Sequence, residues 1–324
     1  MFGYLRNRPY AIGVDAGNDS LKLVQLAQNG KGVTLIAGKR EDRPEDVDPG
    51  SANWQRWAIV AMREAMATSR FHGREVVAAI PASDVFIDNI KIGVPFQSGS
   101  QHGSPTLKGN SDKLPRAISS KIEQKLPFEL DDAIVKYIPT EGDNALVIAT
   151  ERKIIDRHLA MHERAGVTIK SIAAWPMALA NCYTKFFGRR KTDLEAIVML
   201  LDTQASSTNV VICRHKNVLL ACSIPIGTKQ LDDEKMATRL VLELTACRRR
   251  FASIYQDARI ERLIFLSGPA VEQDTYINIA KQMEIQAQMG DCMAAVEIAN
   301  PYRSGINKRV SHVNWATAFG LSLS

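Results

Sequence analysis

The chain has 324 residues, of which 45% are hydrophobic and 23% are charged. This composition is typical of a folded protein, and the length favours two domains or lobes over one core. No apolar run reaches the ~20 residues that a membrane-spanning helix needs, and the first residues lack the pattern of a signal peptide, so we expect a cytoplasmic protein. The net charge of +6 arises from mostly dispersed Lys and Arg residues. They are not interleaved with aromatic residues, as they are on surfaces that bind single-stranded nucleic acid, so we expect no nucleic-acid partner. The five cysteines show no metal-binding spacing, which predicts buried free thiols.

The first eighty residues predict a three-stranded meander followed by a loop, a helix and a buried strand. Asn29-Gly30 is a hairpin turn between apolar segments. Gly73 lies just past the end of the helical periodicity. The predicted elements are strands over Tyr10–Asp15, Leu21–Ala27 and Val33–Ala37, a loop over Lys39–Gly50, a helix over Asn53–Ser69 and a strand over Val76–Ile80.

A β-rich insert then interrupts this first unit. The segment Gln97–Asp112 is rich in Ser, Gly and Asn and poor in apolar residues, so we expect a flexible surface loop there. Pro127 ends the helix that follows the loop, and Gly166 closes the next one. The predicted elements are strands over Val85–Ile92, Ala133–Tyr137, Ala145–Ala149 and Val167–Ile172, and helices over Leu114–Lys125, Lys153–Ala165 and Met177–Phe187.

The second half of the chain repeats the meander. A long helix follows it, with an apolar stripe at spacings of three and four residues. The predicted elements are strands over Ala196–Asp202, Thr208–Arg214, Val218–Pro225, Arg262–Leu266 and Ile285–Ala287, helices over Glu234–Tyr255, Ala270–Met283 and Asn314–Phe319, and a turn at Ser267-Gly268-Pro269.

One pattern occurs in both halves, over Ile12–Val24 and over Val198–Ile212: an apolar strand ends in Asp, small polar residues make a turn, and a second apolar strand leaves. Two such hairpins can face each other across a cleft. Their turn amides can then hold phosphate oxygens, while Asp15 and Asp202 hold a metal ion or its water. The alternative for each Asp is a turn residue that caps its own backbone amides, with Lys22 in solvent.

His158 and His162 are one helical turn apart, a spacing found in metal sites, but no third ligand is evident. We therefore expect two solvent-exposed histidines on an amphipathic helix. The six histidines of the chain show no pairing typical of nucleophilic catalysis, so we predict no catalytic residue.

Taken in order, these elements resemble the PilM family of type IV pilus assembly proteins, a branch of the actin-like ATPase superfold. The segments that carry the resemblance are Ile12–Leu26, Lys125–Leu130, Ala149–Gly166, Ile224–Gly227, Ile264–Ala270, Asn300–Tyr302 and Ala316–Leu321. The resemblance implies an α/β fold of the actin-like (ribonuclease H-like) type with two lobes and a β-rich insert in the first. It implies a first lobe over 1–80, an inserted subdomain over 81–173 with a flexible loop at 97–112, a connecting helix and linker over 174–191, and a second lobe over 192–324.

The resemblance also implies a site for ATP or ADP with Mg²⁺ between the lobes, with Asp15 and Asp202 as the metal ligands. The cofactor-binding residues carried over from the family are Asp15, Gly17, Asn18, Asp19, Ser20, Lys22, Asp202, Thr208, Gly227 and Gly268.

Three nucleotide elements depart from the family's pattern. Gln204 stands in place of a glycine and would fill the space of a phosphate. Pro269 follows Gly268 and removes an amide donor. Thr228 follows Gly227 where the family has a second glycine, and the subdomain that covers the nucleotide is shortened. We therefore expect weak or absent nucleotide binding and little or no ATPase activity.

In function, the resemblance implies a scaffold at the inner face of the cytoplasmic membrane, in the platform of a type IV pilus or type II secretion-like machine. Its partner would be the N-terminal cytoplasmic peptide of a PilN-like single-pass inner-membrane protein, held in a groove beside the insert. Other platform components would also bind, and membrane association would come through partners. Two alternatives from the same superfold stay open: an active ATP-dependent phosphotransferase of the sugar-kinase branch, and a filament-forming protein of the FtsA type.

Overall fold

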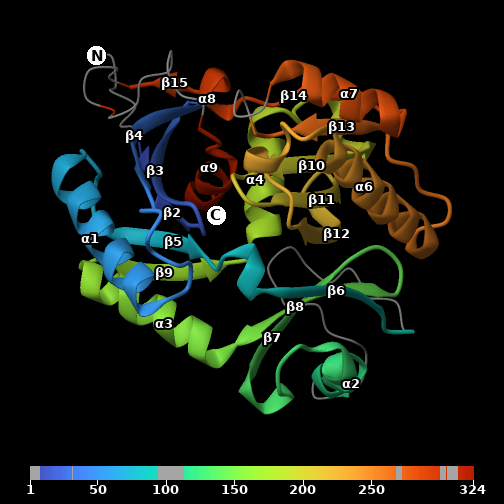
Figure 1. Ribbon diagram of the computed structural model, residues 1–324, viewed down its shortest axis with the longest axis horizontal. Helices are drawn as coiled ribbons and strands as arrows, with labels where there is room; N and C mark the ends of the chain where they lie inside the picture. Colours follow the sequence, from blue (N-terminus) through green and yellow to red (C-terminus); the bar gives the residue numbers. More distant parts are fainter. Residues whose placement is uncertain (1–7, 31, 94–112, 268–271, 300–303, 305–312) are drawn as a thin grey trace.

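Two large sheets stand side by side with helices between and outside them, and a smaller third sheet lies against them (Figure 1). The structure is a computed structural model that describes residues 8–30, 32–93, 113–267, 272–299, 304 and 313–324. The predicted loop 97–112 and Gly268 lie outside the described residues. Among the described helices, none is long and apolar enough to cross a membrane.

The first sheet has seven strands, in the order β15-β4-β3-β2-β5-β9, with β1 paired to β3. The predicted meander β2–β3–β4 is confirmed as antiparallel, and β5 and β9 add to it in parallel. The strands are β1 (Arg8–Pro9), β2 (Ile12–Ala16), β3 (Ser20–Asn29), β4 (Gly32–Asp42), β5 (Glu75–Ala79), β9 (Thr168–Ala173) and β15 (Glu297–Ile298).

Two helices cover the outer face of this sheet, α1 (Ala52–Thr68) and α3 (Arg152–Ala165). The helix α1 begins where the Ser51 side chain accepts a hydrogen bond from the Trp54 amide, which satisfies one of the donors of the first turn. It buries Trp54, Ala58 and Met62, which are four residues apart and so share one face.

The second sheet has five strands, in the order β12-β11-β10-β13-β14. The long helix α6 (Glu234–Ile254) and α7 (Gln273–Met283) bury one of its faces. The strands are β10 (Ile197–Thr203), β11 (Thr208–Arg214), β12 (Asn217–Ile224), β13 (Arg262–Phe265) and β14 (Gln286–Met289).

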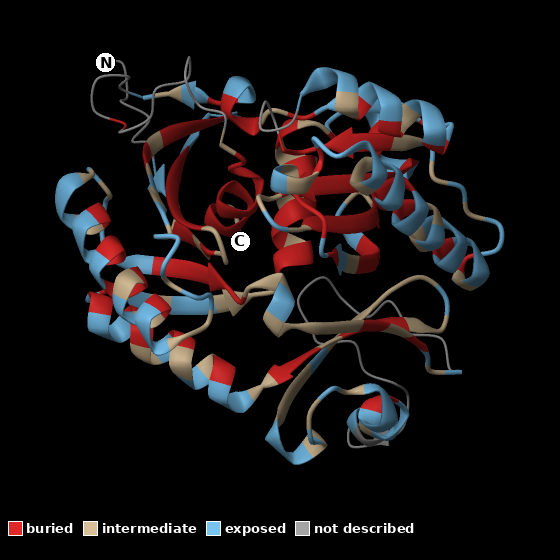
Figure 2. Ribbon diagram, viewed as in Figure 1, coloured by how far each residue is buried: buried red, intermediate tan, exposed pale blue. Residues whose placement is uncertain are grey.

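Between the two sheets lie α4 (Trp175–Phe186) and α9 (Ala316–Ser322), buried on nearly every side (Figure 2). Glycines let these elements approach closely: a Cβ on Gly320 would lie 1.8 Å from the Ala178 carbonyl oxygen of α4, and one on Gly13 of β2 would lie 2.1 Å from that of Ala318. Only residues without a side chain permit this spacing.

The third sheet, in the order β6-β8-β7, is antiparallel and belongs to the segment between β5 and β9. One face packs on α2 through Ile118 and Ile122. The elements are β6 (Phe86–Lys91), β7 (Ala133–Pro139), β8 (Asn144–Glu151) and α2 (Lys113–Ile122). Shorter helical elements complete the described fold: α5 (Lys191–Glu195), α8 (Cys292–Ala295) and the 3-10 turns Ala82–Asp84, Glu123–Lys125, Leu130–Asp132 and Thr228–Gln230.

The strand β9 lies in the range 81–173 of the predicted inserted subdomain, yet it pairs with β5 in the first sheet. The short helix α5 begins at residue 191, where the linker was expected to end. The division of the chain into domains stays a prediction.

The expectation of two solvent-exposed histidines is wrong. His158 and His162 are 1% and 0% exposed and lie under α1, with the His158 ring 5.9 Å from that of Trp54. Burial lowers the pKa of His158 to about 3 and also lowers that of His162, so both rings are neutral in the folded protein.

This burial predicts a loss of stability in acid. An unfolded histidine binds a proton near pH 6.5, whereas folded His158 stays neutral until about pH 3, so stability falls as the pH drops below 6.5. The slope attributable to His158 is up to about 1.4 kcal/mol per pH unit. Denaturant unfolding of His158→Leu between pH 6.5 and 4 should show a shallower pH dependence than the unmodified protein, whereas His72→Leu, which removes an exposed histidine, should not. Equal slopes in all three proteins would contradict the prediction.

Candidate functional site

The two Asp-tipped hairpins face each other, as the repeated pattern predicts, and their turns touch. The Ser206 hydroxyl of the second turn donates to the Asp19 carboxylate of the first at 2.8 Å. Lys229 lies 3.8 Å from the same carboxylate. Below these contacts, the Lys22 ammonium donates to the Gln204 side-chain oxygen at 2.9 Å. Side-chain contacts therefore connect the two hairpins both at their turns and at Lys22.

A cavity of about 290 Å³ lies at this junction, near the lower end of the size range for ligand pockets. Six of the predicted cofactor residues line it, all from the first hairpin: Asp15, Gly17, Asn18, Asp19, Ser20 and Lys22. The second hairpin contributes Gln204, Ser206, Ser207 and Asn209 instead of the residues that were predicted. Both hairpins therefore contribute residues of their turns to the cavity.

Lys22 is the centre of the polar contacts in the cleft. Its ammonium group lies 3.2 Å from the Asp15 carboxylate and donates to Gln204, and the residue is only 4% exposed. A solvated Lys22 is therefore ruled out. A buried cation that is paired with a carboxylate occupies the position between the hairpins that was predicted for a metal ion.

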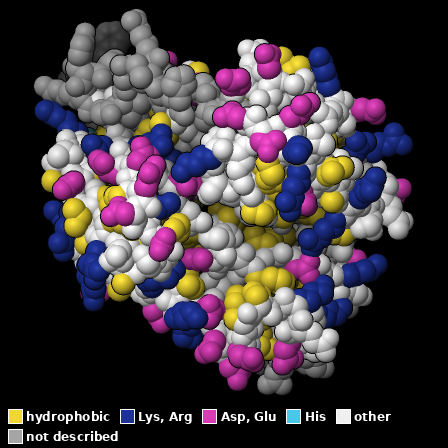
Figure 3. Space-filling view, in the orientation of Figure 1, with side chains coloured by type: hydrophobic (Ala, Val, Ile, Leu, Met, Phe, Trp, Pro, Cys, Tyr) yellow, Lys and Arg dark blue, Asp and Glu magenta, His cyan; other side chains and the backbone are white. Residues whose placement is uncertain are grey.

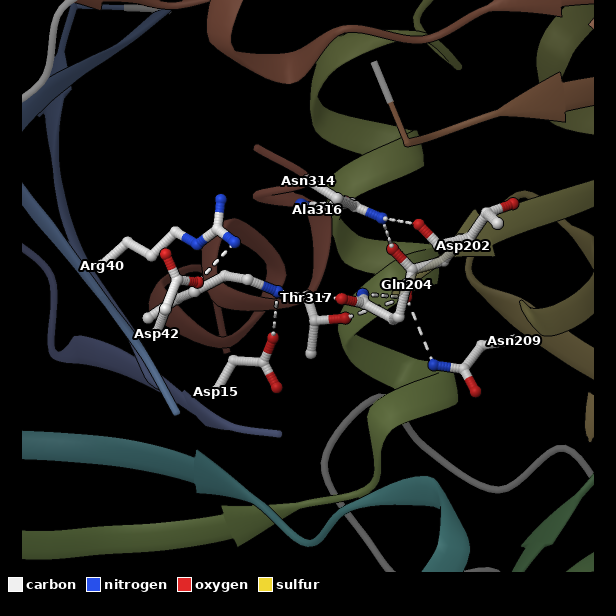
Figure 4. Close-up of polar contacts among 11 residues, drawn as sticks. Asp15, Arg40, Asp42, Asp202, Gln204, Asn209, Asn314, Ala316 and Thr317 are labelled. Carbon is white, nitrogen blue, oxygen red and sulfur yellow. Dashed lines mark hydrogen bonds and ion pairs between the residues drawn. The ribbon is translucent and has the colours of Figure 1, made fainter. Parts of the chain in front are cut away.

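Gln204 connects this cation to the second hairpin (Figure 4). Its amide nitrogen donates to Asp202 at 2.8 Å, while its oxygen accepts from Lys22. Gln204 thus places a side chain, with both of its polar ends hydrogen-bonded, across the cleft.

Asp202 is fully buried under this bridge. Beside Gln204, three further side chains donate to its two oxygens: Asn314 at 2.6 Å, Asn209 at 3.2 Å and Thr317 at 3.4 Å. Burial raises the pKa of Asp202, opposed by the hydrogen bonds and by the charge of Lys22. Its oxygens face protein donors, and it does not line the cavity. Within the described part of the chain, no group of three or more His, Cys, Asp or Glu side chains could hold a metal ion.

Thr208 and Gly227 shape the second turn from behind. The Thr208 hydroxyl donates to the Ile226 carbonyl at 2.7 Å. The backbone of Gly227 lies so close to the turn that a Cβ would approach the Ala205 carbonyl to 2.5 Å, and the amides of Thr228 and Lys229 donate to the turn's carbonyls. Neither residue lines the cavity.

Sequence reasoning missed Asn209, Asn314 and Thr317. Asn314 and Thr317 come from the start of α9, more than 110 residues from Asp202 along the chain. No local pattern connects them. The available signal was the cluster of polar residues just before and within an otherwise apolar terminal helix.

No protein-family profile and no curated protein sequence matches the chain. Among solved structures, a chain of the PilM–PilN type IV pilus biogenesis complex matches with a TM-score of 0.75 and 17% identity, over 97% of this chain and 98% of that one.

Two further solved structures match at lower scores. The cytoplasmic domain of EpsL, an inner-membrane component of the type II secretion system of Vibrio cholerae, has a TM-score of 0.47 and 13% identity over 79% of this chain and 81% of its own. A Bacteroides thetaiotaomicron protein of actin-like ATPase fold and unknown function has a TM-score of 0.48 and 9% identity over 89% and 93%.

The chain therefore has the predicted fold class, an α/β fold of the actin-like type with two lobes. Within that class, its structure is similar along nearly its whole length to the matching chain of the PilM–PilN complex.

The residues present fit a nucleotide phosphate on one side only. The turn from Gly17 to Ser20 lines the cavity, and its Gly17 amide already donates to the Ser20 carbonyl. A phosphate on this side would meet the remaining amides and the polar side chains of the turn. Across from it, the Gln204 side chain lies between the second turn and Lys22, where it is hydrogen-bonded at both ends. A phosphate between the hairpins would have to displace this bridge.

We predict that Gln204→Gly raises the affinity for Mg·ATP by about tenfold or more, because it removes the obstructing side chain and frees Lys22; tenfold corresponds to about 1.4 kcal/mol. The measurement is calorimetric titration of both proteins. Gln288→Gly, a matched change on the exposed strand β14, should leave the affinity as it is. Tight binding by the unmodified protein, equal to that of Gln204→Gly, would show that the bridge does not obstruct the site.

Proposed function

We propose that this chain is a scaffold of a type IV pilus or type II secretion-like assembly platform, acting at the inner face of the cytoplasmic membrane. Its proposed partner is the N-terminal peptide of a PilN-like single-pass membrane protein. The observation that carries the proposal is the likeness to a chain of the PilM–PilN complex over 97% of this chain. Likeness of the whole architecture, insert included, supports a shared mode of assembly more than any single motif does.

The state of the cleft supports a scaffold over an enzyme. Phosphoryl transfer to a substrate hydroxyl in kinases uses an Asp carboxylate that is free to accept its proton. Here Asp15 is ion-paired with Lys22, and Asp202 is buried under four donors. Nucleotide binding, in this proposal, is weak, and turnover is absent. The bridged cleft then serves as a junction that sets the relative position of the lobes.

In this proposal, the peptide binds along an edge of the third sheet. Its order β6-β8-β7 leaves β7 with a strand neighbour on one side only among the described residues. An extended peptide can add to such an edge by main-chain hydrogen bonds, with its alternate side chains in neighbouring pockets. Ile134 of β7 is half-buried and belongs to none of the core clusters formed by described residues. Figure 3 shows further apolar side chains in the hollow between this sheet and the second lobe.

The proposal predicts binding of a synthetic peptide that carries the N-terminal segment of the PilN-like protein from the same genome, measured by fluorescence anisotropy against a scrambled peptide. Ile134→Asp should weaken binding at least about tenfold, because a charge would replace apolar surface beside the edge. Ile277→Asp, on the exposed face of α7, is the matched control and should bind as the unmodified protein does.

A second form of the peptide tests the mode of binding without altering the protein. Methylation of alternate backbone amides in one register should abolish binding, because those amides donate to the strand edge, whereas methylation in the other register should be tolerated. No binding of the unmodified peptide, steady release of inorganic phosphate from Mg·ATP, or transfer of the ATP γ-phosphoryl group to a sugar would each overturn the proposed function.

A further inference from the structure

Two cysteines that are 25 residues apart in the sequence meet in space. The Sγ atoms of Cys222, on β12, and Cys247, on α6, are 3.1 Å apart. Both residues are half-buried, unlike Cys182, Cys213 and Cys292, which are buried. The prediction of buried thiols is therefore wrong for this pair, because both residues lie where α6 crosses the edge strand of the sheet.

The pair can be reached by a small molecule. Both cysteines line a cavity of about 410 Å³ between β12 and α6, together with Arg239, Glu243 and Arg250. Two arginines and one glutamate thus lie beside the thiols, and Arg250 is also paired with Asp88. A cationic group next to a thiol favours its thiolate form.

The two thiols differ in chemistry. The pKa of Cys247 is lowered, mainly by the hydrogen bond with the Cys222 thiol and further by Arg250, against the opposing effect of burial. The pKa of Cys222 is raised by the same hydrogen bond and by burial. We assign Cys247, which lies one helical turn before Arg250, as the attacking thiol, and Cys222, 3.1 Å away, as the second thiol.

We propose that Cys222 and Cys247 form a thiol–disulfide exchange site that takes a small-molecule disulfide, such as oxidised glutathione, as its oxidant. The Cys247 thiolate attacks one sulfur of the oxidant, whose disulfide bond breaks and releases one thiol. Cys222 then loses its proton and attacks Sγ of Cys247, and the second thiol leaves. Two protein thiols are oxidised to one disulfide, and the oxidant is reduced to two thiols. The sulfurs need to approach from 3.1 Å to about 2.05 Å.

The bond would fasten α6 to β12 next to a contact between lobe and insert. Arg250 lies one helical turn after Cys247 and pairs with Asp88 of β6. The same strand β12 accepts a hydrogen bond at the Leu219 carbonyl from Asn89 of β6. Oxidation would therefore hold together two of the elements through which the second lobe touches the insert.

The test uses the full-length protein, reduced and then incubated with oxidised glutathione. Thiols are counted by alkylation under denaturing conditions, and the linkage is mapped by mass spectrometry without reduction. We expect two of the five thiols to be lost, a linked pair of peptides containing Cys222 and Cys247, and full reversal by dithiothreitol. The oxidised protein should also unfold at a temperature higher by roughly 5 °C, because the disulfide lowers the conformational entropy of the unfolded chain.

Variants separate the roles of the two thiols. Cys222→Ser should stop at a stable glutathione adduct on Cys247, Cys247→Ser should react far more slowly, and Cys182→Ser should behave as the unmodified protein. Retention of all five thiols in the unmodified protein, a linkage between other cysteines, or a stable glutathione adduct without a linkage would each overturn the proposal. Mapping of the linkage in the unmodified protein tests the proposal even if a variant fails to fold. The experiment uses no peptide, so its result is independent of the proposed function.

Discussion

The spacing of the two lobes is set by direct backbone packing around α9. This helix lies against β2 at Gly13 and against α4 at Gly320, at distances that leave no room for a Cβ. The Ser322 hydroxyl also donates to the Ala11 carbonyl and accepts from the Leu26 amide, which fixes α9 along the first sheet. Close packing of this kind does not deform gradually. The two hairpins are therefore held at one separation, at which Lys22 just reaches Gln204.

That separation makes the polar bridge possible, and the bridge in turn favours a single arrangement of the lobes. Burying a charged Lys–Asp pair stabilises a fold little, because the lost hydration offsets the attraction. Leaving either partner alone in the same place is far more costly. Lys22, Gln204 and Asp202 thus act as a unit in which every polar end has a partner. Opening the cleft would leave buried polar groups without one, so the network specifies the closed junction more than it adds to the total stability.

The sequence predicted what local patterns determine. The hairpins around Asp15 and Asp202 each lie within about fifteen residues, and their alternation and turns are visible in the chain. The contacts of Asp202 with Asn314 and Thr317 depend on how a distant helix packs, and no spacing rule reports that. The histidines show a different failure. On α3 the buried residues Ile154, His158, Met161, His162 and Ala165 share one face, but counting histidine as polar breaks the apolar stripe and hides the burial.

The position of β12 connects the cleft to the insert. At its end, Ile224 pairs with Thr208 of the second hairpin, and Ile226 accepts the Thr208 hydroxyl two residues later. Nearer its start, the Leu219 carbonyl accepts from Asn89 of the insert and from Tyr255, the residue that follows α6. The strand β12 is thus hydrogen-bonded both to the second hairpin and to the insert. A ligand that prefers one position of the insert can shift the hairpins only to the extent that its affinity differs between the two arrangements. By linkage, if a ligand at the insert changes the affinity of the cleft for a second ligand by some factor, that second ligand changes the affinity at the insert by the same factor. Because a rigid strand and not a flexible loop joins the two places, a bridged cleft is compatible with a binding role: it would hold the insert in one position, ready for its partner.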